Sequence, residues 1–123
     1  MSKKDYEENF CTFILSHGRP NTVKTYDTLR NHGYTGKIFI ICDNEDSTID
    51  EYRENYGDQV IMFDKKAIAD RIDNADNTHS RKGVTYARVA SYDIARGLGY
   101  KYFWQLDDDY LSFYHVFNGK KET

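Results

Sequence analysis

The sequence predicts an α/β protein of three layers, in which helices cover both faces of a mostly parallel sheet. Two observations favour this fold: short apolar runs alternate with helix-like stretches along the chain, and neither a linker nor a repeat interrupts the alternation. A length of 123 residues suits one domain with a core of its own. We therefore expect a single domain over residues 1–123, with a Rossmann-like αβα arrangement.

Four apolar runs predict the strands. Residues 10–15 and 37–42 are apolar at nearly every position, which is typical of strands covered on both faces. Residues 59–63 and 102–106 indicate two further strands, and residues 110–117 could form one more short strand. Because strands joined through helices run parallel, their carboxyl ends are expected at one edge of the sheet.

Helices are predicted between the strands from apolar spacing and terminal residues. The first carries Val23, Tyr26 and Leu29 on one face, with Asn21 expected to cap it and Gly33 to end it.

The later helices differ in how clearly they are indicated. Residues 48–51 have the form of a capping box, and the helix that follows should end at Gly57. Residues 65–80 are ambiguous, since a short helix is allowed but residues 73–78 are those of a polar loop. The clearest helix has apolar residues at 3-4-3-4 spacing over 84–98, before Gly99.

The composition narrows the classes of function. A net charge of −3 argues against bulk electrostatic attraction to nucleic acid, although a local basic groove stays open. The chain is 15% aromatic, with 11 tyrosines, and tyrosines can line sites that stack flat rings. We expect Tyr86, Tyr92 and Tyr110 mainly to pack.

The cellular location of the protein is predicted from three features of the sequence. No window is long and apolar enough for a membrane span, and the first residues have no apolar core of a secretory signal. Cys11 and Cys42 each fall in a predicted buried strand, too far apart for a disulfide if the strands are parallel neighbours. These features favour a cytoplasmic protein that does not contact membranes.

Polar residues gather where the predicted strands end. Ligands of open α/β sheets bind at the carboxyl edge of the strands, so this rim is the expected site. Four short segments follow the strands there: residues 16–19, 43–44, 64–65 and 107–109.

Three consecutive aspartates after the last strand are the strongest chemical signal. In an extended segment Asp107 and Asp109 would converge while Asp108 faces elsewhere. Two carboxylates near one point suit Mg²⁺ or Mn²⁺, which also bind phosphate oxygens. The alternative is a solvated acidic turn.

Basic residues could neutralise a diphosphate at the same rim. Candidates are Arg19, after the first strand, Arg81 and Lys82, before the clearest helix, and Arg88, at the margin of its apolar stripe. Arg81 and Lys82 could equally be ordinary surface charges. His17 could contact a nucleotide, or it could only form hydrogen bonds with backbone groups of the turn.

The order of these segments resembles the nucleotide-sugar-binding half of GT-A glycosyltransferases. Residues 16–20 resemble the first nucleotide-contacting loop, with Ser16 among the implied contacts, and residues 106–109 resemble the Asp-x-Asp motif. Residues 86–88 resemble the family's Ala-Arg-Asn element, although Val89 stands in place of the Asn.

This resemblance implies roles for residues and a donor. Asp43 would contact the nucleobase, and Asp107 would contact ribose or sugar and the metal, with Asp108 beside it in the nucleotide-sugar site. Asp109 would hold Mn²⁺ or Mg²⁺ against the diphosphate. The implied donor is a nucleotide sugar, with a UDP-sugar favoured, and the implied enzyme is hexosyltransferase-like.

Among GT-A proteins the first loop and the residues around the aspartates look most like the phage-associated TET-associated glycosyltransferases. That family is linked to sugar addition on modified DNA bases, which implies a DNA acceptor and, for a phage-encoded chain, the host cytoplasm.

The sequence departs from the GT-A pattern at its end. Only Glu122 lies downstream of the aspartates as a candidate base, so the acceptor half is expected to be missing. Self-association or a partner would then supply it. Three interpretations stay open: a metal-dependent transferase or its donor half, a binding module for a nucleotide or nucleotide sugar, and, less favoured, a nucleotidyltransferase.

Overall fold

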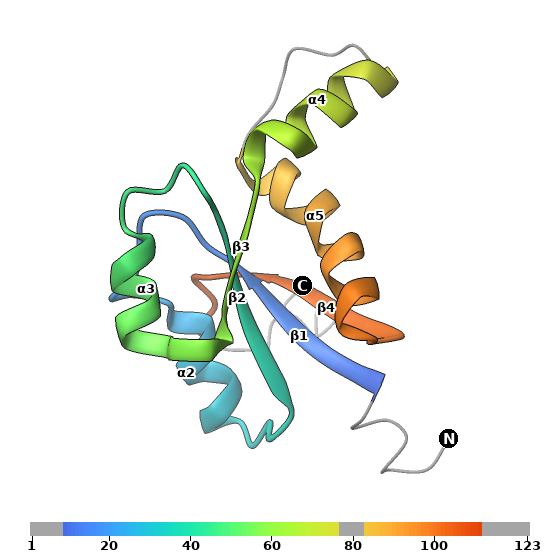
Figure 1. The fold of residues 1–123 in the computed structure, drawn as a ribbon. Helices are drawn as coiled ribbons and strands as arrows, with labels where there is room; N and C mark the ends of the chain where they lie inside the picture. The colour runs from blue at the N-terminus through green and yellow to red at the C-terminus, as the bar shows by residue number, and fades with distance from the viewer. Residues whose placement is uncertain (1–8, 77–82, 112–123) are drawn as a thin grey trace, which may run out of the picture.

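The computed structural model describes residues 9–76 and 83–111, and it shows the predicted three-layer α/β fold (Figure 1). Four parallel strands form one sheet in the order β3-β2-β1-β4. The strands are β1 (Phe10–Leu15), β2 (Lys37–Asp43), β3 (Val60–Phe63) and β4 (Tyr102–Asp107). The prediction of a parallel sheet flanked by helices is confirmed.

The helices divide between the two faces of the sheet. Helices α2 (Lys24–Asn31) and α3 (Ile49–Tyr56) pack on one face, while α4 (Lys65–Asp76) and α5 (Gly83–Leu98) pack on the other (Figure 1). A short 3-10 turn, η1 (Gly57–Gln59), connects α3 to β3. At 16 residues α5 is the longest described helix, and no helix in that part of the chain has the length and apolarity to cross a membrane.

The pleat of the strands sorts their apolar residues into two cores. Phe13, Leu15 and Ile41 lie in the core beneath α4 and α5. Ile14 and Ile40, one residue away on each strand, lie in the core beneath α2 and α3. This alternation explains why β1 and β2 are apolar at nearly every position.

The two cysteines are buried free thiols, as predicted. Cys11 lies opposite Lys37 in the register of β1 and β2, so Cys42 is five residues farther along the neighbouring strand. They also belong to different cores, on opposite faces of the sheet. No disulfide can join them.

The predicted cap of α2 is wrong, and the predicted cap of α3 is right only in position, since Thr48 is the N-cap residue. Helix α2 begins after Val23, and the Asn21 side chain instead accepts a hydrogen bond from Asn55 Nδ2 (3.0 Å). Before α3 the Thr48 side chain makes no cap; its hydroxyl donates to Asp46 Oδ1 (2.6 Å). Gly57 ends α3 as expected, with a φ of 59° that favours glycine.

Several boundaries also differ from the prediction, and β2 and β4 each end one residue later than expected. Residues 73–76, expected in a loop, are the last turn of α4. Packing of α4 against α5 outweighs the weak helix propensity of these residues, and the Arg71–Asp93 ion pair (2.7 Å) joins the two helices. Strand β3 starts at Val60, one residue late. Residues 110 and 111 are not in a strand, and the rest of the predicted segment 110–117 lies outside the described residues.

Candidate functional site

A cavity of about 280 Å³ opens at the carboxyl ends of the four strands. Its walls are formed by the last residue of each strand, the segments that follow β1 and β4, and one residue of α5: Leu15, Ser16, His17, Arg19, Asp43, Phe63, Ala87, Asp107, Asp108 and Asp109. The sheet order places β1 beside β4, with the helix after β1 on one face and the helix before β4 on the other. This switch point is where open α/β sheets bind ligands.

The register brings the predicted residues together. Leu15 pairs with Ile41 on one side and with Asp107 on the other, so β1 and β4 end level, while β2 extends two residues farther, to Asp43. Seven of the predicted residues line the cavity: Ser16, His17, Arg19, Asp43, Asp107, Asp108 and Asp109. Arg88 reaches it through Asp107, and Arg81 and Lys82 lie outside the described residues.

A closed circuit of hydrogen bonds holds one wall of the cavity. Ser16 Oγ donates to Asp108 Oδ2 (2.6 Å), so the Tyr52 hydroxyl, 2.6 Å from Ser16 Oγ, must donate to the serine. The Tyr52 oxygen accepts the backbone N–H of Arg19 (2.8 Å). Arg19 Nη1 then donates to Asp108 Oδ1 (3.0 Å), which closes the circuit.

This circuit gives Asp108 a different setting from the one expected. Strand β4 ends at Asp107, so residues 108 and 109 form a turn and the alternation of an extended segment does not apply. Asp108 is buried and both its oxygens are occupied, while Arg19 keeps 56% of its side chain exposed. Asp108 therefore orients the guanidinium that a ligand can reach. Burial raises the pKa of Tyr52 to about 12, which keeps its hydroxyl a donor.

At the other side of the cavity, the His17 side chain contacts two buried carboxylates. Its Nδ1 lies 2.8 Å from Asp43 Oδ2 and 3.6 Å from Asp46 Oδ2. A carboxylate only accepts, so Nδ1 carries a proton, and Nε2 is an acceptor in the neutral form of the ring. The His17 side chain is 58% exposed and that of Asp43 4%, so the imidazole is the more accessible group.

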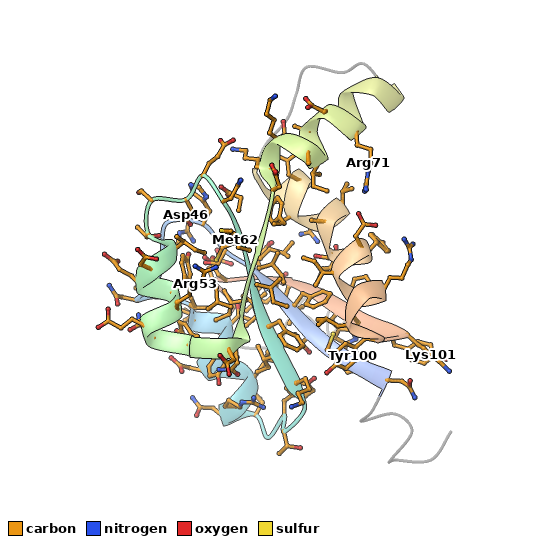
Figure 2. The ribbon with its side chains drawn as sticks, viewed as in Figure 1. Asp46, Arg53, Met62, Arg71, Tyr100 and Lys101 are labelled. Carbon is orange, nitrogen blue, oxygen red and sulfur yellow. The ribbon has the colours of Figure 1, made fainter. Side chains whose placement is uncertain are left out.

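Asp46 supports this pair from behind, in the loop between β2 and α3 (Figure 2). It accepts hydrogen bonds from the backbone N–H groups of Gly18 and Thr48 (both 2.8 Å) and from the Thr48 hydroxyl. Burial alone would raise the pKa of Asp46, but these hydrogen bonds and the charge of His17 outweigh it and hold the pKa below its usual value. The residue is thus a fixed negative charge behind the imidazole.

Helix α2 fixes the turn that carries the aspartates. Its Thr25 hydroxyl donates to the carbonyl of Asp107 and accepts the backbone N–H of Tyr110 (2.9 Å). The backbone N–H of Thr25 donates to the carbonyl of Asp108 (3.2 Å), and Thr28 Oγ1 donates to that of Tyr110 (2.7 Å). Helix α2 therefore fixes the backbone of the turn through hydrogen bonds. The carboxylates of the turn are not used in these bonds.

Arg88 connects α5 to the end of β4. Its Nη2 lies 3.2 Å from Asp107 Oδ1, and its carbonyl accepts a hydrogen bond from Gln105 Nε2 (2.9 Å). Both side chains of the Arg88–Asp107 pair are close to half exposed. A diphosphate at Asp107 would therefore lie within reach of an arginine already held in place.

The carboxylates at the end of β4 suit a divalent cation that takes its remaining ligands from the substrate. Asp107 and Asp109 both line the cavity, and Asp109 makes no ion pair within the described residues. In that part of the chain no three carboxylate, imidazole or thiol groups form a metal cage. Mg²⁺ commonly binds through one or two carboxylates plus phosphate oxygens, so the two aspartates fit such a site.

Three residues of the site have no obvious signal in the sequence. Tyr52 looks like one more apolar position on a helix face, and Thr25 looks like an ordinary exposed helix residue. Asp46 lies within an acidic loop whose members are indistinguishable in sequence. Each acts through a partner more than 25 residues away, Tyr52 on Ser16, Thr25 on Asp107 and Asp46 on Gly18.

Comparison with known families agrees with this geometry. The sequence model of the family described as TET-Associated Glycosyltransferase matches residues 10–123, which is nearly the whole chain. No curated protein and no solved structure gives a significant match. The chain belongs to the TET-associated glycosyltransferase family.

Proposed function

We propose that this chain binds a nucleoside-diphosphate sugar in the cavity at the strand ends and serves transfer of the sugar. The observation that carries the proposal is that Asp107, Asp108 and Asp109 line one cavity at the switch point of the sheet, where Asp108 holds Arg19 and Asp107 holds Arg88. Membership of a glycosyltransferase family supports the reaction class. The GT-A donor site is the closest chemical description of this arrangement.

The diphosphate is assigned to the side of the cavity that contains Arg19 and Asp107, to which Arg88 is bound. Arginine binds phosphate oxygens through two parallel N–H groups, and Asp108 holds the Arg19 guanidinium for that contact. Asp107 and Asp109 would hold Mg²⁺ or Mn²⁺, which would neutralise charge on the diphosphate. Arg81 and Lys82 stay candidates for the same role.

The nucleobase is assigned to the side that contains His17 and Asp43. Asp43 Oδ1 accepts the backbone N–H of Glu45 (2.9 Å) and Oδ2 faces His17, so its carboxylate is largely used within the protein. His17 Nε2 then presents the acceptor for a ring N–H such as that of uracil, and Asp43 acts by orienting it. A UDP-sugar is the donor we favour on this ground.

The proposed reaction breaks the bond between the anomeric carbon and the diphosphate oxygen. The electron pair leaves with the nucleoside diphosphate, and an acceptor hydroxyl oxygen bonds to the anomeric carbon as its proton passes to solvent water. Arg19 and Arg88 stabilise the negative charge that develops on the leaving group. We propose a hydroxyl of a modified DNA base as the acceptor. The buried free thiols of Cys11 and Cys42 suit action in the reducing cytoplasm.

Calorimetry of UDP with and without Mn²⁺ tests the donor site. We expect the cation to strengthen UDP binding in the wild-type chain and to have little effect in Asp109→Ala. Asp70→Ala, which removes an equally exposed carboxylate from α4, is the matched control and should bind as wild type does. Equal UDP affinity with and without the cation in all three proteins would overturn the metal assignment.

A transfer assay separates an enzyme from a binding module. The chain is incubated with radiolabelled UDP-sugars, Mn²⁺ and hydroxymethylated DNA. Label on the DNA supports transferase activity. UDP binding without transfer would show that the chain needs an acceptor-binding partner.

A further inference from the structure

A second and larger hollow lies along the outer edge of β4, and none of the residues that line it lines the cavity assigned to the donor. Its volume is about 710 Å³. Aromatic rings of α5 and β4 line it, among them Tyr92, Tyr102, Phe103 and Trp104. Tyr92 is 61% exposed and Tyr102 48%, so the expectation that Tyr92 mainly packs is wrong. We call this hollow the β4 groove.

The charge of the β4 groove is opposite to that of the whole chain. The chain has 20 acidic and 17 basic side chains, yet the described residues that line the groove include Arg88 and Lys101 and no carboxylate. Lys101 makes no ion pair within the described residues, whereas Arg88 is paired with Asp107 of the donor cavity. Lys101 lies just before β4, at the end of the strand away from the aspartates (Figure 2). A partner that fits this surface carries negative charge and presents apolar surface.

The rings are arranged so that they can accept further flat groups. Tyr92 meets Phe103 edge to face, with centroids 5.2 Å apart and the planes at 78°. Such a contact uses little of the Tyr92 ring, which agrees with its exposure. Exposed aromatic rings beside cations are the combination with which proteins bind unpaired nucleic acid strands, because bases stack on the rings while phosphates meet the cations.

One ion pair links the β4 groove to the donor cavity. Arg88 and Gln105 line the groove, and they are joined by the hydrogen bond from Gln105 Nε2 to the Arg88 carbonyl. Arg88 also pairs with Asp107, which lines the cavity. A strand bound in the groove would therefore lie next to the end of the cavity assigned to the diphosphate.

We propose that the β4 groove binds an unpaired segment of DNA and leads its acceptor base toward the donor cavity. Bases stack on Tyr92 and Tyr102, and Lys101 contacts a phosphate. The choice of DNA rests on the proposed function, whereas the stacking and charge arguments do not. The groove inference and the proposed function can therefore be refuted independently of each other.

Fluorescence anisotropy with a labelled twelve-residue oligothymidine tests the inference on the full chain. We expect the single strand to bind more tightly than a duplex of the same length. Tyr92→Ala should weaken strand binding about tenfold, whereas Tyr92→Phe, which keeps the ring, should bind as wild type does. Lys101→Ala should lower the slope of log affinity against log salt by about 0.7, the value for one phosphate contact of a single strand.

Controls separate the groove from the donor site and from folding. Lys24→Ala removes an exposed lysine from α2, on the other face of the sheet, and should leave the salt slope unchanged. UDP affinity and melting temperature should stay at wild-type values in Tyr92→Ala and Lys101→Ala.

Two results would overturn the inference while UDP still binds. One is strand binding that is absent or unaffected by both Tyr92→Ala and Lys101→Ala. The other is sedimentation showing a dimer that Tyr92→Ala dissociates, because the groove would then be the interface between two copies. Strand binding through the groove without UDP binding would instead refute the donor proposal alone.

Discussion

The hydroxyl of Tyr52 is the point at which the circuit around Arg19 and Asp108 is best tested. Tyr52→Phe keeps the shape of a fully buried side chain and removes one oxygen, so no cavity forms. Two hydrogen bonds are lost, one to Ser16 and one from the backbone of Arg19.

The expected cost follows from these two contacts. A buried hydrogen bond contributes about 0.5–1.5 kcal/mol, so the free energy of unfolding should fall by roughly 2 kcal/mol. With an unfolding entropy of about 2.1 cal/mol/K per residue, this lowers the melting temperature by roughly 8 °C. UDP affinity should fall as well, because the loop that carries Arg19 loses its anchor.

Differential scanning calorimetry and UDP titration measure the two effects. Tyr56→Phe is the matched control, since it makes the same change one turn later on α3, where the described residues offer the hydroxyl no hydrogen bond. It should change stability by less than about 0.5 kcal/mol. If Tyr52→Phe and Tyr56→Phe melt at the same temperature and bind UDP equally, the circuit does not hold the cavity wall.

Three further perturbations have definite outcomes. Burial raises the pKa values of the Cys11 and Cys42 thiols and of the Tyr52 phenol to about 12. As the pH rises, these groups lose their protons in the unfolded chain before they do so in the folded chain. The free energy of unfolding should therefore be at its full value below pH 9 and fall as the pH rises from 9 to 12. Denaturation measured at a series of pH values checks this. Thr12→Val replaces a buried hydroxyl that has no hydrogen-bond partner in the described structure, so it should raise the melting temperature by a few degrees; a lower melting temperature would contradict this. Asp43→Ala should weaken UDP by about 1–3 kcal/mol but leave pyrophosphate binding unchanged in titrations, and an equal loss for both ligands would instead indicate a folding defect.

The strands and the rim of the site could be predicted because their signals are local. A run of six apolar residues such as β1 is explained by two buried faces, and both faces are covered. Parallel strands necessarily end at one edge, so the polar residues after them had to meet there. Asp43 and the three aspartates were found by this reasoning.

The orientation of single side chains could not be predicted in the same way. Asp108 turns inward because the strand ends one residue before it, and the strand end depends on hydrogen bonds from Thr25 of α2. Asn21 is not a cap because Asn55, from another helix, binds it. Each of these outcomes depends on contacts between distant segments, which a local pattern does not contain.

The circuit around Asp108 also has a consequence for how the domain folds. It joins residues 16–19 to residue 52 and to residue 108, with sequence separations of 33–36 and 89–92 residues. The cavity wall can therefore form only after β4 has docked beside β1, at the end of the longest loop closure in the sheet. A ligand that needs Arg19 in place should slow amide hydrogen exchange in β1 and β4 together, because separating these two strands breaks the circuit.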